Sequence, residues 1–367
     1  MDYLHQSKSL EPNNSLESHL YKREPYLHFK EVVKTKMIEC VFTIDYEIFG
    51  NGEGSLKELV YTPAERLISL FHRWDARFVP FVEVAEFERI EAEGSDPAID
   101  LVKQQIKKFH DEGFELGLHL HPQWYNAKYE NNRWLLDYSE YNLCVLSKEK
   151  ITQIVERATR YLQNIIGDPD FIPLSYRAGN WLFQPTKNIA EVLAQKGIKV
   201  DSSVFKGGLQ HKYSLDYRKS LTNGYYWKFL DDVNIPHPVG TLLEVPIYTK
   251  MVPFWQMLTS KRVGMQRKAT TLSKAKTGRL QRLQDYLRLT YPLKFDFCRM
   301  TREELNRMLD RVVQEDQKNP SIYRPLVLIG HTKDLDDFDT VDSFLSSLRQ
   351  KKIPIVTFEA VYDRCNS

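Results

Sequence analysis

Apolar runs typical of strands alternate with amphipathic runs typical of helices along most of this 367-residue chain. This alternation limits the folds open to the chain more than any other feature, because strands separated by helices predict a parallel sheet with helices outside it. About seven such units favour a distorted (β/α) barrel of about seven parallel strands over an open sheet. We expect strands at 37–43, 77–82, 114–121, 174–177, 198–201, 243–248, 326–329 and 353–357, and helices at 62–74, 97–112, 147–166, 186–195, 301–317 and 339–350.

Two stretches depart from the alternation. Residues 1–36 are polar and lack periodicity, which predicts an N-terminal arm beside a barrel that spans 37–365. Residues 207–297 hold at most one convincing strand, so we expect an inserted, partly helical segment. Its run 261–288 is strongly basic, with Asp285 as the one acid. Such a run is usually a solvated face, although it could also contact nucleic acid or a membrane, or hold a phosphorylated or lipid-linked sugar.

Charge and cysteine content exclude several classes of protein. The 51 Lys and Arg nearly balance the 49 Asp and Glu, so net charge predicts no nucleic-acid partner. No apolar run approaches the roughly 18 residues of a membrane span, and the first residues lack the features of a secretory signal. The four scattered cysteines predict neither a disulfide framework nor a thiolate zinc site. These features favour a cytoplasmic protein.

Two pairs of polar residues stand at or after expected strands. Asp45 and Glu47 are two positions apart, so on an extended chain they face the same side and can enter one pocket. The alternative is a polar strand end that is acidic by chance. His119 and His121 share the same spacing, and two imidazoles on one side of a strand are a common way to hold a divalent metal. Alternatively, they are core histidines bonded to carbonyls.

Two single residues complete the pattern. Arg177 ends a strand and is followed by Ala-Gly-Asn-Trp; its guanidinium is suited to orienting a carboxylate, or to an ordinary ion pair. His331 comes directly after the apolar strand 326–329. There it would stand at a barrel mouth, where a pKa near neutrality suits proton transfer, unless it is a surface-loop histidine.

The order of these motifs resembles the polysaccharide deacetylase family, also called family 4 carbohydrate esterases, which has the NodB homology fold. The resemblance covers about residues 37–360 and implies a distorted barrel with a divalent metal at its mouth. It assigns the catalytic base to Asp45, metal ligands to Glu47, His119 and His121, orientation of the base to Arg177, a place on the pocket wall to Trp181, support of the catalytic histidine to Asp201, and the general acid to His331.

This chain departs from the family's motifs at several positions. Tyr46 separates two acids that are adjacent in the family. The histidines stand two apart instead of four, with Gln123 where the second is expected. Ala-Gly follows Arg177 in place of the more familiar Pro-Pro. These differences indicate a divergent branch. Tyr46 and Trp124 could stack on a sugar ring, or could equally belong to the core.

The resemblance implies a metal-dependent hydrolase that removes an N-acetyl or related acyl group from a sugar or polysaccharide precursor, for example in surface-polysaccharide biosynthesis. Zinc is the first choice of metal, with cobalt, nickel, iron and manganese as alternatives. The expected substrate is a carbohydrate, either free or linked to a nucleotide or lipid. One alternative is a non-catalytic carbohydrate-binding member of the same fold. Another is a metal-independent glycoside hydrolase using Asp45 and Glu47, which would leave the two histidines unexplained.

Overall fold

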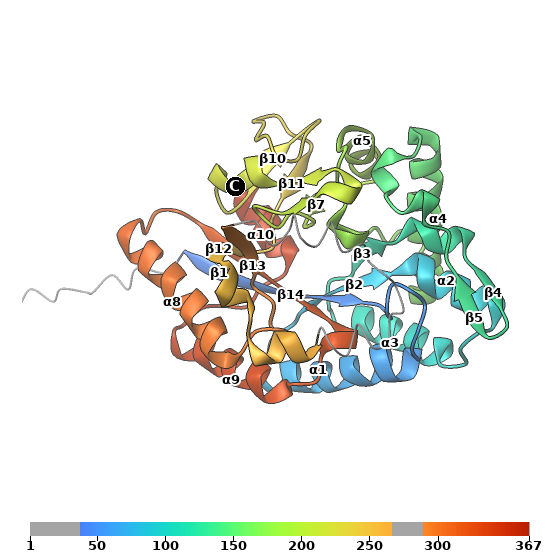
Figure 1. Cartoon of the computed structure of the whole chain (residues 1–367), viewed down its shortest axis with the longest axis horizontal. Helices are drawn as coiled ribbons and strands as arrows, with labels where there is room; N and C mark the ends of the chain where they lie inside the picture. Colours follow the sequence, from blue (N-terminus) through green and yellow to red (C-terminus); the bar gives the residue numbers. More distant parts are fainter. Residues whose placement is uncertain (1–36, 266–288, 367) are drawn as a thin grey trace, which may run out of the picture. The chain divides into compact units, whose positions relative to one another are not determined.

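A curled sheet forms the centre of the computed structural model, which describes residues 37–265 and 289–366 (Figure 1). The sheet has eight strands in the order β10-β11-β7-β6-β3-β2-β1-β14. All are parallel except β10, which pairs antiparallel with β11 at one edge. The seven parallel strands confirm the expected α/β barrel class. Their bounds are β1 (Ile38–Tyr46), β2 (Val79–Glu83), β3 (Gly117–Leu120), β6 (Ser175–Ala178), β7 (Val200–Asp201), β11 (Leu242–Glu244) and β14 (Arg324–His331), with β10 at Trp227–Phe229.

Isolated bridges join the two ends of this sheet. Ile247, just beyond β11, bridges Phe205 on one side and Val327 of β14 on the other. The backbone N–H of Tyr248 also donates to the carbonyl of Val327 at 3.0 Å. Pro246 in the same run has no N–H to give, which helps to explain why the closure rests on single bridges and not on a regular ladder. The barrel is therefore closed but distorted.

Helices lie around the sheet and follow most of the expected ranges (Figure 1). Ser147 caps the start of α4 by accepting a hydrogen bond from the N–H of Lys150, and Gly167 ends it with a φ of 81°. Thr301 and Glu304 form a capping box at the start of α8. None of the described helices is long and apolar enough to cross a bilayer. The helices are α1 (Thr62–Arg73), α2 (Val84–Glu93), α3 (Ile99–Asp111), α4 (Lys148–Ile166), α5 (Lys187–Gln195), α8 (Arg302–Lys318), α9 (Phe338–Gln350) and α10 (Phe358–Asn366).

Two local predictions need correction. The run 353–357 is not a strand: within it only Ile355 forms a bridge, to Cys40 of β1, and Pro354 breaks the ladder. Helices α2 and α10 were not expected from the sequence. Helix α2 follows β2 without a loop, and the side chain of Glu83 caps it by accepting from the N–H of Glu86. Because Glu83 both ends β2 and caps α2, no loop residues between the two elements mark the start of the helix in the sequence.

The segment 207–297 contains more β-structure than expected. It includes β10 and β11 of the barrel sheet and two separate hairpins, formed by β8 (Leu209–Gln210) with β9 (Leu215–Asp216) and by β12 (Thr249–Pro253) with β13 (Thr290–Lys294). Strands of two to five residues are too short to show a clear period of two, so the expectation of at most one strand was wrong. Residues 260–265 are helical.

The N-terminal arm at 1–36 and most of the basic run, 266–288, lie outside the described residues. At the start of that run, Lys261 pairs with Asp337 at 2.9 Å and Arg262 pairs with Glu304 at 2.6 Å. These two basic residues therefore contact acids at the starts of α9 and α8 instead of facing solvent unpaired.

Candidate metal centre

The carboxyl ends of adjacent barrel strands, here called the mouth, bring the four motifs together. In the strand register Asp45 of β1 lies opposite His331 of β14, and His119 of β3 lies opposite Arg177 of β6. Each of these residues is at most 6% exposed. Because neighbouring parallel strands end on the same side of the barrel, residues far apart in sequence share one buried site.

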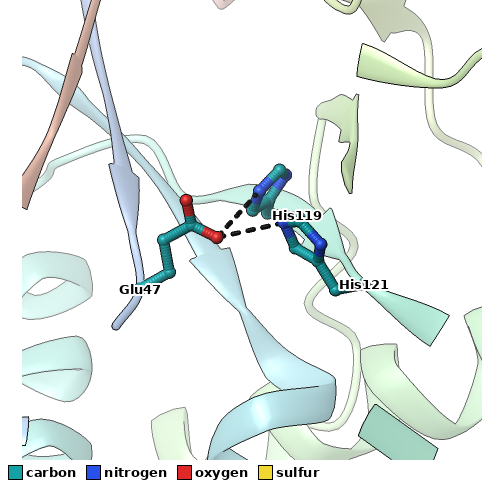
Figure 2. A group of neighbouring side chains, drawn as sticks. All are labelled: Glu47, His119 and His121. Carbon is teal, nitrogen blue, oxygen red and sulfur yellow. Dashed lines mark ion pairs between the residues drawn. The ribbon is translucent and has the colours of Figure 1, made fainter. Parts of the chain in front are cut away.

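Glu47, His119 and His121 converge on a single point (Figure 2). Oε2 of Glu47 lies 3.5 Å from Nε2 of His119 and 3.1 Å from Nε2 of His121. Two ligands bound to a tetrahedral zinc ion at about 2.0–2.1 Å are roughly 3.3 Å apart, so these separations suit such an ion. Two histidines and one glutamate are also a donor set used by catalytic zinc.

The hydrogen bonding of His119 supports the same fit. Its Nδ1 lies 2.8 Å from the backbone carbonyl of Arg177 and therefore donates its proton to that oxygen. Its Nε2 is buried without a hydrogen-bond partner. A histidine that ligates a metal typically donates its other ring N–H in this way. The unpartnered nitrogen of His119 is thus the atom that a metal would bind.

Two side-chain amides surround the other histidine. Nδ1 of His121 lies 3.1 Å from the amide of Asn180 and 3.3 Å from that of Gln123. The amide oxygen of Gln123 is buried and has no partner among the described residues. Rotation of that amide by half a turn would give His121 an acceptor for an Nδ1 proton and leave Nε2 free for a metal. Gln123, at the position of the family's second histidine, therefore contacts the histidine that replaces it.

Lys333 is a third partner of Glu47 that the motifs did not indicate. Its ammonium lies 2.7 Å from Oε1 of Glu47. Burial alone would raise the pKa of Glu47, but Lys333 and the two histidines lower it well below its usual range. The only sequence signal was the position of this lysine two residues after His331. Glu47 is consequently ionised, with Oε1 paired to the ammonium and Oε2 facing the histidines.

Asp45 forms the second half of the site. Arg177, completely buried, donates to Oδ1 of Asp45 at 2.6 Å, and its Nε donates to the carbonyl of Ser202 at 2.9 Å. Nε2 of His331 lies 3.3 Å from Oδ2 of Asp45. Burial would raise the pKa of Asp45, but Arg177 and the nearby histidines outweigh it and lower that pKa. Asp45 is thus held as an oriented carboxylate.

The expected support of His331 by Asp201 is corrected by the structure. Asp201 lies on β7, where its carboxylate accepts from the hydroxyl of Ser203 at 2.7 Å and interacts with Glu244 on β11. The acid found beside the outer nitrogen of His331 is Asp334, with its Oδ2 3.9 Å from Nδ1. The physical reason is the pairing of β7 with β11, which directs Asp201 toward the neighbouring strand.

The aromatic predictions have mixed outcomes. Tyr46 is one step along β1 from both acids, so its ring points to the opposite face, where it is completely buried and donates to Gln105. Trp124 is also completely buried, and its ring packs against Trp134 at 5.1 Å. Neither ring can contact a sugar at the mouth. Trp181 does lie there, with its ring 6.1 Å from that of His331.

Gly179 allows β3 and β6 to approach closely beside the histidines. A Cβ atom at this position would lie 2.5 Å from the carbonyl oxygen of Leu120 and 2.9 Å from Cγ of His121. Any side chain would push against backbone and a candidate ligand. The glycine at the second position of the Ala-Gly pair after Arg177 therefore has a packing reason.

Comparisons with known proteins agree with this architecture. No family model matches the chain, and no curated protein matches it in sequence. Among solved structures, the chain is similar to a candidate polysaccharide deacetylase from Mycobacterium smegmatis, with a TM-score of 0.50 and 14% identity over 90% of both chains. It is more distantly similar to PuuE allantoinase (TM-score 0.43, 14% identity, 89% of both chains) and to a polysaccharide deacetylase from Bacillus cereus (TM-score 0.37, 13% identity, 87% of this chain and 91% of that one). The first likeness shows that this chain has a divergent polysaccharide deacetylase-like fold.

Proposed function

We propose that this protein is a metal-dependent hydrolase that removes an acyl group, an N-acetyl group first of all, from a sugar. The observation that carries the proposal is the convergence of Glu47, His119 and His121 beside the Asp45–Arg177 pair in a barrel of this fold. As substrate we propose a precursor of a surface polysaccharide, free or linked to a nucleotide or lipid, in the cytoplasm.

Glu47, His119 and His121 would hold the metal, with zinc as first choice and cobalt, nickel, iron or manganese sharing the same ligands. When bound, a divalent ion supplies a water of lowered pKa and polarises the acyl carbonyl. The chain holds its candidate ligands in place before any ion binds, because Glu47 is paired with Lys333 and His119 with the carbonyl of Arg177.

Asp45 and His331 would move the protons. Asp45 is ionised and oriented by Arg177, so it can accept a proton from the attacking water. His331 stands beside Asp45 at the mouth and would give a proton to the departing amine. A carboxylate of low pKa is a weak base, so Asp45 can accept this proton only from a water whose own pKa is lowered.

The glycoside hydrolase alternative is disfavoured by the electrostatics of the site. Such an enzyme needs one carboxylic acid whose pKa is raised, so that it can protonate the leaving group. Here Arg177 and Lys333 pair with the two acids, and the pKa values of both Asp45 and Glu47 are lowered. Neither acid is suited to donate a proton.

Metal content and acetate release from a panel of N-acetylated sugars test the proposal, with two acid variants to separate the roles. Asp45→Asn should keep the metal and lose about 10²–10⁴-fold in turnover, because the amide cannot accept the proton. Glu47→Gln should lose metal, with activity partly restored by excess ion. Metal retention without any acetate release would favour the binding-only alternative. The opposite pattern of metal loss would exchange the two roles.

A further inference from the structure

Lys294 contributes a cation to the mouth from outside the four motifs. It ends β13, in the hairpin with β12. Its Nζ lies 3.2 Å from the centre of the Trp181 ring and 5.0 Å from that of Phe205. The ring of Trp181 also lies 6.1 Å from the ring of His331, and the charges of Asp45 and Arg177 both act on this ammonium. A residue of the segment between β11 and β14 therefore takes part in the mouth.

The other cations around the mouth are each paired with an acid. Arg177 pairs with Asp45, Lys333 with Glu47, and Arg299 with Asp334 at 2.5 Å. Among the residues that the structure describes, by contrast, Nζ of Lys294 has neither an ion pair nor a hydrogen bond, and its close neighbours are aromatic faces.

The electrostatic environment of this lysine agrees with its missing partner. Burial lowers the pKa of Lys294 to about 7, and the attraction of Asp296 does not make up for the lost hydration. Contact with aromatic faces holds an ammonium in place but replaces its hydration only in part. An anion bound here would supply the missing hydrogen bonds and charge.

We propose, on the basis of the proposed function, that Lys294 forms a subsite for an anionic group of the sugar substrate, a phosphate or a carboxylate next to the acylated unit. Ammonium and oxyanion attract each other strongly where water is partly excluded. Lys294 also covers one face of Trp181, so the sugar does not stack on that face. The enzyme should therefore prefer an acidic sugar over its neutral parent.

Equilibrium binding measures this preference without relying on turnover. The probes are N-acetylglucosamine, N-acetylglucosamine 1-phosphate and N-acetylmuramic acid, titrated into the metal-loaded protein. At least one of the two acidic sugars should bind about tenfold more tightly than the neutral one, and the comparison of the phosphate with the carboxylate identifies the anion. Equal dissociation constants for all three sugars would overturn the proposal.

Substitutions assign the preference to this residue. Lys294→Met should remove it, and Lys294→Arg should retain part of it by keeping the positive charge. Lys250→Met is the matched control, because Lys250 lies on the partner strand β12, opposite Leu293, and should leave the preference unchanged. A preference that persists in Lys294→Met, or in Lys294→Gln if the methionine variant does not fold, would show that the lysine is merely structural.

The outcomes separate this inference from the proposed function. Binding that prefers acidic sugars, with no acetate release from any of them, would contradict the hydrolase but leave the subsite standing. Acetate release, together with equal dissociation constants for neutral and acidic sugars, would contradict the subsite but support the hydrolase.

Discussion

At the scale of single residues, the candidate ligands depend on neighbours to which the motifs assign no role. Gln123 and Asn180 both face Nδ1 of His121, while Lys333 occupies one oxygen of Glu47. Such partners orient a ligand and determine which of its atoms carries a proton. The shortened spacing of the histidines is therefore accompanied by a changed set of supporting side chains.

Replacing Gln123 with leucine should weaken metal binding by about 10–100-fold, the usual effect of removing a partner of a ligating histidine. The leucine fills similar space but offers His121 no acceptor. Competition with a chromogenic chelator measures the affinity. The same change at the exposed Gln350 of α9 is the control. Unchanged affinity in the Gln123 variant would leave Asn180 as the sole amide that supports His121.

At the scale of elements, the carboxyl group of Glu115 links the amino end of helix α10 to the amino end of strand β6. This link lies at the end of the barrel opposite the mouth. Glu115, two residues before β3, accepts from the N–H of Glu359 in the first turn of α10 at 2.9 Å. It also accepts from the hydroxyl of Ser175 at the start of β6, at 3.3 Å. Burial raises the pKa of Glu115 to about 7, although these hydrogen bonds oppose the shift.

This shift predicts a pH dependence of stability. Glu115 is protonated more easily in the folded chain than in the unfolded chain, where its pKa is about 4.3. Its contribution is therefore complete below about pH 4 and is lost as pH rises through about 7, by up to about 4 kcal/mol. Glu115→Gln should abolish this loss of stability with rising pH. Urea unfolding between pH 5 and 8 measures the free energy of unfolding, with the exposed Glu58→Gln as the control variant. If the free energy of unfolding changes with pH equally in wild type and both variants, the prediction is contradicted.

At the scale of the whole barrel, the buried charges of the mouth compensate one another without a metal. Asp45 is paired with Arg177 and Glu47 with Lys333, each pair at less than 3 Å. A buried carboxylate without such a partner would cost several kcal/mol and could make the fold depend on the ion. The barrel should therefore stay folded without a bound metal ion.

Chelation should lower the unfolding temperature without unfolding the protein at 25 °C. The loss is the linkage free energy of the bound ion, about 2.7 kcal/mol at a free ion concentration of 100 times its dissociation constant. A thermal scan with and without chelator measures it. The double variant His119→Ala, His121→Ala should not respond to the chelator. Complete unfolding on chelation at 25 °C would instead make the metal structural.

Much of this protein is encoded in local periodicity. The apolar pattern predicted seven parallel barrel strands and most helices, because burial on both faces of a strand leaves a continuous apolar run, and burial along one stripe of a helix leaves a repeat of about 3.6 residues. The strand period of two placed Asp45 with Glu47 and His119 with His121, and it also turns Tyr46 away from them, into the core.

Only the tertiary structure decided which distant residues meet. The partnership of Lys333 with Glu47, the turning of Asp201 toward Glu244 and the closure of the barrel at Ile247 all join segments that no short repeat relates. The same is true of Lys294, which reaches Trp181 from another hairpin. The physical reason is that a residue's own neighbours in sequence set its local conformation and facing, whereas the charges and rings that it contacts are set by how the whole sheet curls.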